Sequence, residues 1–447
     1  MLIAVPIMVQ NGITNFVSML DNIMVGRVGT DPMSAVAIVN QLIFIWNLCI
    51  FGGLSGIGIF TAQFFGKGDE EGIRYTFRLE MYLITILLIG GILTLLFGDT
   101  RLISLYLKGE AGSGDPAATL AFGKSYLHVM LLGFLPFAVT QVYATTVRAM
   151  GETVMPMVAS VTAVLVNLAG NYILIYGKFG APALGVTGAA AATVLSRFVE
   201  GVILIGWVHA HTEKNRFIVG VFRSFYVPVG LLKNCVKKGL PLLINETLWS
   251  SGMAVMTQTY SLRSLDVVAA NNIAQTISNV FNISFIAMGS AIGIILGQEL
   301  GKGHLKTARR DAERLSLLSV LMSVFFGAAL FFMAGLFPQI YNTSGEVQRL
   351  ATGFIRIAAV CMPLYAYTNA AYFTLRSGGR TLITFLFDSC FVWAVSIPLA
   401  YGLVHGTALG ILTIFLIVQL VETVKCLLGF VLVRREIWVR DITQYGQ

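Results

Sequence analysis

Two segments half a chain apart carry nearly the same sequence, and this duplication constrains the fold more than any other feature. GIGIFTAQFFGKG at 56–68 returns as AIGIILGQELGKG at 291–303, so that Gln63 corresponds to Gln298. Two further echoes keep the same order: 147–151 with 375–379, and 197–200 with 419–422. The chain therefore consists of two homologous halves. In a membrane protein, such halves are typical of secondary transporters, whose substrate path lies between the repeats.

The composition indicates a membrane protein. Hydrophobic residues make up 56% of the chain, charged residues 12%, and the mean hydropathy is +0.79. A soluble domain has about 25% charged residues. Apolar runs of roughly 20 residues, enough to cross a bilayer, recur along the whole length. We count twelve spans, at about 2–26, 34–63, 80–98, 122–149, 154–177, 184–211, 237–262, 268–299, 314–336, 349–375, 381–404 and 407–434.

The expected architecture follows from these spans. An all-α membrane protein should have an N-terminal six-helix lobe at 1–211, a linker at 212–236, a C-terminal six-helix lobe at 237–434 and a tail at 435–447. Lys and Arg are concentrated in the connections that leave even-numbered spans, which predicts that these loops and both termini are cytoplasmic. Six spans per half mean that both halves insert in the same direction, so a pseudo-twofold axis should run along the membrane normal.

Several functional classes are disfavoured by the sequence. The net charge of +8 comes from short connections between apolar runs, so we expect no nucleic-acid partner. The five cysteines show no paired or metal-type spacing. The first residues have no basic region, so a signal peptide is not expected. No HExxH motif, no Ser-Lys or Ser-His dyad within the spans, and no Walker-type glycine loop is present, which disfavours an enzyme or an ATP-driven pump.

Motifs spread over nearly the full length resemble the multidrug and toxic compound extrusion (MATE) family. They are DNIMVGRVG at 21–29, QFFGKG at 63–68, RAMG at 148–151 followed by Pro156, NYILIYG at 171–177, GVTGAAAAT at 185–193, and GLP at 239–241. The resemblance implies a twelve-helix antiporter with two pseudo-symmetric lobes around a central cleft. It would export organic, often cationic, compounds from bacteria across the cytoplasmic membrane in exchange for H⁺ or Na⁺, without a cofactor and as a monomer.

The first candidate site is built around Asp21, about four helical turns into the first span. A carboxylate at membrane depth usually faces a wet cavity or a partner, and one removed from water can exchange a proton near neutral pH. The alternative is an aspartate at the outer end of its helix. The resemblance favours the first interpretation, because Asp21 matches the carboxylate of the family's N-terminal lobe.

Two amides and a hydroxyl complete this candidate site. Asn167 and Asn171 are four residues apart and share one helix face, and they match amide positions of the family, as Thr193 matches a hydroxyl. Together with Asp21 they form the predicted ion-coupling site for H⁺, or for Na⁺ with Asp21, Asn167 and Asn171 as ligands. Asn171 stands where some family members carry Asp, and a single carboxylate favours H⁺. A plain interhelical hydrogen bond is the alternative for the amides.

Further candidates lie in the second half. Glu246 resembles the C-lobe carboxylate of Na⁺-coupled relatives, but the tenth-span Asp of those relatives has no counterpart near Tyr365. Glu246 is therefore expected either to attract cationic substrates or to pair with Lys238. Asp388 is expected to contact substrate, or to make a structural hydrogen bond near Ser389 or Arg380. Trp249, Met253 and Met256 complete the predicted substrate cleft, since aromatic and Met side chains adapt to varied ligands.

A flippase for lipid-linked precursors, from the same wider superfamily, is the alternative function. Such proteins tend to have more spans and a basic central cavity. The charges predicted inside the membrane here are mainly acidic, which favours the export of organic cations over the handling of a polyanionic lipid.

Overall fold

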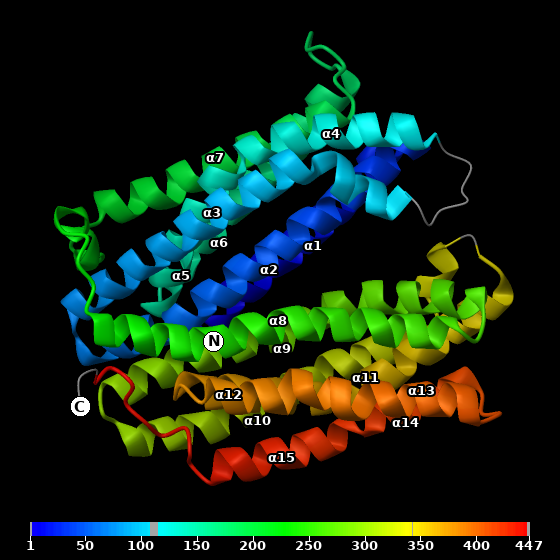
Figure 1. Ribbon diagram of the computed structural model, residues 1–447. Coiled ribbons are helices and arrows are strands. Elements are labelled where there is room, and N and C mark those ends of the chain that lie inside the picture. The colour runs from blue at the N-terminus through cyan, green and yellow to red at the C-terminus, as the bar shows by residue number, and fades with distance from the viewer. Residues whose placement is uncertain (1, 108–114, 342, 445–447) are drawn as a thin grey trace. The chain divides into compact units, whose positions relative to one another are not determined.

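The computed structural model describes residues 2–107, 115–341 and 343–444, and every regular element within these ranges is a helix (Figure 1). Nine of the described helices are long and apolar enough to span a membrane, and the bent pair α4 (Pro116–Leu132) and α5 (Phe134–Ala149) is a tenth. Two further long helices, α1 (Ala4–Gly26) and α8 (Val229–Ser261), complete the series. Helices thus cover all twelve predicted spans, and the predicted all-α fold is confirmed.

The described chain divides into two compact units. Val9–Thr61 and Glu70–Leu232 form one, called here the first unit, and the remaining described residues form the second unit. Besides α1, α4 and α5, the first half contains α2 (Thr30–Lys67), α3 (Glu70–Leu107), α6 (Val154–Tyr176) and α7 (Val186–Ala210). The last turn and a half of α2 belongs to the second unit. The lobe boundaries expected from the sequence remain a prediction.

The second half continues from α8 with long helices. Its last two spans each consist of more than one helical segment. It contains α9 (Leu265–Gly301), α10 (Leu305–Met333), α11 (Gly345–Ser377), α12 (Thr381–Phe385), α13 (Ile397–Gly406), α14 (Ile411–Leu420) and α15 (Glu422–Arg434). Two π-helical turns, η4 (Leu386–Cys390) and η5 (Val392–Ser396), join α12 to α13 within one span. Such π turns are rare and are found most often at functional sites.

The predicted bounds of several spans differ from the observed helices, and three of these differences are described here. The span expected at 122–149 is bent by 47° between α4 and α5, because Gly133 ends the first helix and Pro136 lacks the N–H that would continue the ladder. The span expected at 80–98 is much longer, since α3 begins at Glu70. The span expected at 407–434 is interrupted at Val421, between α14 and α15.

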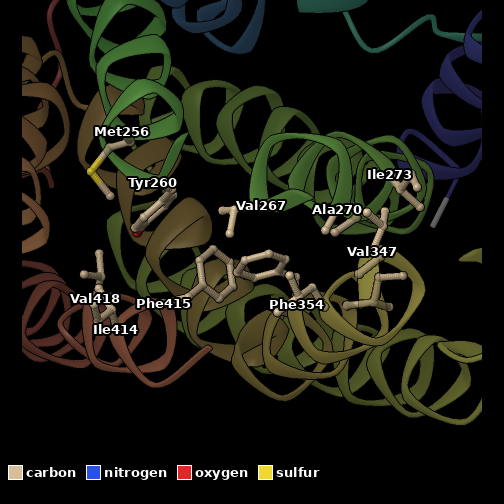
Figure 2. Packing of buried hydrophobic residues seen from close by; sticks show 14 of the residues in the cluster. Met256, Tyr260, Val267, Ala270, Ile273, Val347, Phe354, Ile414, Phe415 and Val418 are labelled. Atoms are coloured by element: carbon tan, nitrogen blue, oxygen red, sulfur yellow. The ribbon is translucent and has the colours of Figure 1, made fainter. Parts of the chain in front are cut away.

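Helix α11 forms the centre of the second unit (Figure 2). Phe354 of α11 packs edge-on against Phe415 of α14 at 4.8 Å between ring centroids, and Tyr260 of α8 approaches Phe415 at 5.6 Å. Val267 and Ala270 of α9 are buried in the same cluster. Because lipid tails are as apolar as these side chains, close packing rather than the hydrophobic effect holds such helices together.

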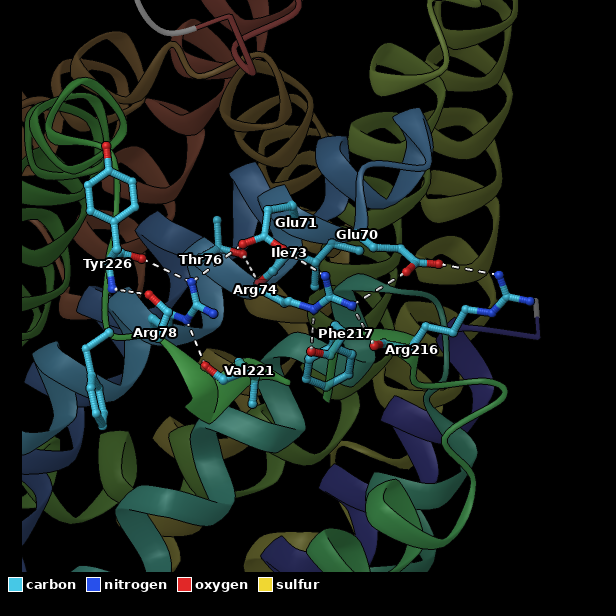
Figure 3. A network of polar contacts seen from close by, with 12 residues as sticks. Glu70, Glu71, Ile73, Arg74, Thr76, Arg78, Arg216, Phe217, Val221 and Tyr226 are labelled. Atoms are coloured by element: carbon cyan, nitrogen blue, oxygen red, sulfur yellow. Dashed lines mark hydrogen bonds and ion pairs between the residues drawn. The ribbon is translucent and has the colours of Figure 1, made fainter. Parts of the chain in front are cut away.

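The linker between the halves is bound along α3 (Figure 3). Arg78 donates from Nε to the carbonyl oxygen of Val221 at 2.8 Å and from Nη1 to that of Tyr226 at 3.0 Å. Arg74 donates from Nε to the carbonyl oxygen of Phe217 at 3.2 Å and pairs with Glu71 at 2.7 Å. The two arginines satisfy backbone carbonyls that lack helical partners, so the basic connection predicted at 212–236 is an ordered strap in this region.

The segment after α15 is packed into the second unit. Trp438 is 1% exposed, and its indole N–H donates to the carbonyl oxygen of Val433 at 3.1 Å. Arg380 donates from Nε to the carbonyl oxygen of Ile437 at 2.7 Å, and Arg309 pairs with Glu436 at 2.8 Å. The described part of the tail is therefore a structural element of this unit.

Gln63, near the end of α2, is fully buried and joins α2 to this tail. Its Nε2 donates to the carbonyl oxygens of Ser377 at 2.9 Å and Arg440 at 3.2 Å. Its Oε1 accepts from the backbone N–H of Ile442 at 2.8 Å. A helix from the first half thus ends inside the second unit.

The duplicated Gly-Lys-Gly segments meet at this place. A Cβ on Gly66 would overlap the carbonyl group of Gln298, and a Cβ on Gly301 would overlap the carbonyl group of Gln63. The ends of α2 and α9 therefore cross with their backbones in contact, and the contact is reciprocal. This explains in physical terms why both repeats carry glycine at the same place.

Candidate functional site

The predicted carboxylate lies between α1 and α6 in the first unit. Asp21 Oδ1 accepts a hydrogen bond of 2.7 Å from Asn171 Nδ2. One turn beyond Asp21, the hydroxyl of Tyr176 donates to the carbonyl oxygen of Met24 at 2.9 Å. This second bond joins the same two helices, so the position of Asp21 against α6 is fixed by two contacts.

The amides lie between Asp21 and α7. Asn167 and Asn171 are 6% and 2% exposed. In its better-satisfied orientation, Asn167 Nδ2 donates to both Asp21 oxygens, at 2.9 and 3.1 Å, and its Oδ1 accepts from the backbone N–H and the hydroxyl of Thr193 at 3.2 and 3.1 Å. The structure therefore brings Asp21, Asn167, Asn171 and Thr193 together as the sequence predicts. We call these four residues the first-half pocket.

Small residues bring α6 and α7 close enough for these bonds. A Cβ on Gly188 of α7 would lie 2.5 Å from the carbonyl oxygen of Leu174, and one on Gly170 of α6 would lie 2.9 Å from Cβ of Ala192. Side chains at either glycine would push the helices apart. The glycine and alanine run of α7 thus sets the distance between Asn167 and Thr193.

Neutral donors surround the Asp21 carboxylate. The carboxylate is partly removed from water and accepts a hydrogen bond from Asn171. No cation acts on it within the described part of the chain. The Oδ1 of Asn171 is buried without a hydrogen-bond partner among the described residues. An acid held by amides, with a spare amide oxygen beside it, can accept a proton or offer oxygen ligands to a small cation.

A second polar cluster lies in the second unit around Asp388, in the π turn η4. Lys425 of α15 donates to Asp388 Oδ1 at 2.7 Å, and Asn245 of α8 donates to Asp388 Oδ2 at 3.1 Å. Asn245 Oδ1 accepts from the hydroxyl of Ser389 at 2.7 Å. Lys425 also lies 3.9 Å from Glu422. We call Asn245, Asp388, Ser389, Glu422 and Lys425 the second-half cluster.

Sequence reasoning did not identify Asn245 or Lys425 of this cluster, and it gave Glu422 a structural role outside the site. Asn245 directly precedes Glu246, which the sequence singled out instead. Lys425 is the more informative omission, because a lysine three residues after Glu422 within an apolar run requires a buried partner. Arg380 was one predicted structural hydrogen-bond partner of Asp388. In the structure, Arg380 donates instead to the carbonyl oxygen of Ile437.

The other second-half candidates all lie on α8 and differ in their surroundings. The charges of Arg376 and Asp388 act on the Glu246 carboxylate. Lys238, the predicted alternative partner of Glu246, donates instead to the carbonyl oxygen of Gly379 at 2.9 Å. Trp249 and Met253 are exposed on the second unit. Met256 is 8% exposed and belongs to the apolar cluster of Figure 2, so its side chain is packed within the unit.

Comparison with known proteins identifies the same family by a sequence model and by named relatives. The sequence model of the MatE family matches residues 6–173 and 241–402. The chain is 24% identical over 421 residues to a Thermotoga maritima protein named "Probable multidrug resistance protein NorM", covering 92% of this chain and 86% of the relative. A Bacillus subtilis protein of the same name is 25% identical, with 91% and 88% covered.

Solved structures share the fold. An outward-facing multidrug resistance MATE transporter of the MOP superfamily superposes with a TM-score of 0.85 at 20% identity, over 98% of this chain and 94% of that one. A MOP superfamily transporter from Pyrococcus furiosus also gives 0.85, at 18% identity, over 98% and 94%. The twelve-helix arrangement inferred from the apolar runs is thus one that solved structures contain.

Proposed function

We propose, on the premise that this chain belongs to the MatE family, that it exports organic compounds, multidrug-type and predominantly cationic, in exchange for an inward flow of H⁺. Family membership makes it a multi-pass membrane transporter and not an enzyme. The names of its relatives support small, varied substrates. A single chain in the bacterial cytoplasmic membrane, with both termini in the cytoplasm, is the working arrangement of this proposal.

The first-half pocket carries the coupling step of the proposal. With Asp21 ionised, Asn171 and Asn167 donate to its two oxygens. A proton on the carboxyl group removes the negative charge that both amides face and weakens these charge-assisted bonds. The bonds join α1 to α6, so their loss favours a different position of α1. That is a two-state bias of the kind that alternating access requires.

The single carboxylate is the observation that favours H⁺ over Na⁺. Na⁺ is held best by several charged or strongly polar oxygens, and the pocket offers one carboxylate, one free amide oxygen and one hydroxyl. The substrate path itself, with Glu246, Trp249, Met253, Met256 and Asp388 as its candidate residues, remains a prediction.

Transport in proteoliposomes tests the coupling step. We expect a pH gradient, and not a Na⁺ gradient, to drive efflux of the organic cation ethidium, and we expect Asp21→Asn to lower this efflux at least about tenfold, to background. The substitution keeps the shape of the side chain but removes its titration. Glu213→Gln, at an exposed linker position, is the matched control and should keep wild-type efflux.

Two results would overturn the proposal. Gradient-driven ethidium efflux retained in folded Asp21→Asn would remove Asp21 from the coupling step. Efflux stimulated by Na⁺ at fixed pH and lost in Asp21→Asn would keep the site but change the ion.

A further inference from the structure

The second-half cluster has a counterpart in the first half. Two positions differ together: a serine and an isoleucine in the first half correspond to an acid and a base in the second. The offsets of the three sequence echoes place the following residues at equivalent positions: Gln10 and Asn245, Arg148 and Arg376, Ser160 and Asp388, Glu200 and Glu422, Ile203 and Lys425. Both halves have an amide side chain at the first of these positions, an arginine at the second and a glutamate at the fourth. Where the first half has Ser and Ile, the second half has an acid and a base.

The first-half version contains one carboxylate. Arg148 Nη2 donates to Gln10 Oε1 at 2.9 Å, Ser160 hydrogen-bonds Glu200, and the charges of Arg148 and Arg197 act on Glu200. The positive charges that act on this carboxylate thus come from Arg148 on α5 and from Arg197 on α7, the helix of Glu200 itself. Ile203, one turn further along α7, adds no charge.

The second-half version contains one more carboxylate, and an ammonium group lies against it. Lys425 Nζ is 2.7 Å from Asp388 Oδ1, 3.9 Å from Glu422 Oε2 and 5.6 Å from the centre of the Phe387 ring. The Lys425 side chain is 6% exposed. Asn245 donates to the second oxygen of Asp388, so that carboxylate has a fixed orientation toward the lysine.

These surroundings are those of a bound monovalent cation. Two carboxylates supply negative charge, and an aromatic face attracts an ammonium ion at this distance. A buried carboxylate pair without a cation would be strongly destabilised. The lysine is held on α15, one turn after Glu422 on the same helix and across from Asp388 in η4. Its ammonium group is therefore present at a high effective concentration at both acids and excludes free ions.

We propose that the Lys425 ammonium is a tethered cation that occupies a monovalent-cation site formed by Asp388, Glu422 and the Phe387 ring, and that shortening this side chain opens the site to small alkylammonium ions or Na⁺. The second-half cluster is then closed to free ions in the native protein. This inference rests on the contacts above and does not depend on the proposed transport function.

Thermal unfolding of the full chain in lipid nanodiscs tests the site. All variants carry Asp21→Asn, so that the first-half pocket contributes no cation binding. Ethylammonium chloride and NaCl are each titrated against the bulky N-methylglucamine chloride at constant ionic strength. We expect Lys425→Ala to lower the unfolding midpoint by roughly 5–10 °C in N-methylglucamine. Ethylammonium should restore at least about half of the loss with a saturable dependence, and NaCl should restore less.

Two results would overturn the inference. One is a folded Lys425→Ala variant whose midpoint responds identically to all three salts. The other is a saturable response in Asp21→Asn alone, since the native lysine should keep the site closed. If Lys425→Ala does not fold in any of the salts, Lys425→Gln is measured in the same way, and a response that does not distinguish ethylammonium from N-methylglucamine again overturns it.

Discussion

Each half of the molecule holds a partly buried aspartate between helices, and the two aspartates have different neighbours. Asp21 accepts hydrogen bonds from Asn171 and Asn167, which carry no charge. Asp388 accepts from Asn245 but also from the ammonium group of Lys425 at 2.7 Å. Among the residues that the structure describes, the first aspartate has no ion-pair partner, whereas the second belongs to an ion pair.

This difference separates two roles that look alike in the sequence. A carboxylate held only by amides responds to protons or cations, because neutralising it removes a desolvation cost. A carboxylate paired with a buried lysine gains little from a proton, because protonation would leave the ammonium group uncompensated. An acid inside the membrane is therefore informative about function only together with the charge of its neighbours.

The largest effect is expected at Gly66 and Gly301, where the two halves have equivalent contacts and the same substitution should have the same effect on stability. Gly66→Ala and Gly301→Ala each place a Cβ on a backbone carbonyl group of the other repeat, so both should cost more than about 4 kcal/mol and lose folded protein. Gly206→Ala, in α7 with nothing within 4 Å of the added Cβ, is the control and should be neutral or slightly stabilising. Yield of monodisperse protein and thermal unfolding measure this. A clear difference between the two repeats would contradict the reciprocal crossing.

The same substitution in the two clusters tests the comparison directly. Asp388→Asn removes the closest ion-pair partner of the buried Lys425 and leaves it only the more distant Glu422, at 3.9 Å, so it should destabilise the protein by about 3 kcal/mol. Asp21→Asn removes a charge that has no opposite charge beside it and should cost less than about 1 kcal/mol. Denaturant or thermal unfolding of both variants gives the two values. Equal losses would mean that the neutralisation of the two aspartates does not differ as described. Asp388→Asn combined with Lys425→Met should recover part of the loss, because the under-compensated ammonium group is removed while the Glu422 carboxylate remains.

The smallest effect is expected when a second carboxylate is added to the first-half pocket. Asn171→Asp places two acids beside Asn167 and should shift the site toward Na⁺, since oxygen charge favours a hard cation. We expect Na⁺ at fixed pH to raise ethidium efflux by Asn171→Asp roughly fivefold, which corresponds to about 1 kcal/mol, whereas the wild-type chain should show no such response. The isosteric control Asn47→Asp, on α2, should not change Na⁺ dependence. An unchanged response in Asn171→Asp would show that the number of charged oxygens does not select the ion.

The helical spans were predictable because long apolar runs and the duplicated segments carry their own signal. The bend between α4 and α5 depends on Gly133 and Pro136 together within an apolar run, which in sequence looks like a continuous helix. The π turns around Asp388 have no sequence signal at all, because their geometry depends on packing. Tail packing was equally hidden, since the apolar residues around Trp438 form only a short run in a mostly polar stretch.

The first-half pocket was predictable because its amides are four residues apart on one helix face, and the resemblance selected Asp21 among several acids. The second-half cluster was not, because its members come from α8, η4 and α15, far apart in sequence. Lys425 could have been found by requiring a partner for every charge within an apolar span. That requirement would have paired it with Asp388 or Glu422 but could not have chosen between them.

The burial of Gln63 against residues 440–442 has a consequence for how the protein is made. Helix α2 leaves the ribosome early, but its last turn finds its hydrogen-bond partners only when α11 and the segment after α15 have been synthesised. Until then the Gln63 amide and the glycine surface of α2 lack their packing partners. Packing at the end of α2 is thus completed only by residues translated after α15, and a fusion partner joined close to residue 444 would first disturb the end of α2.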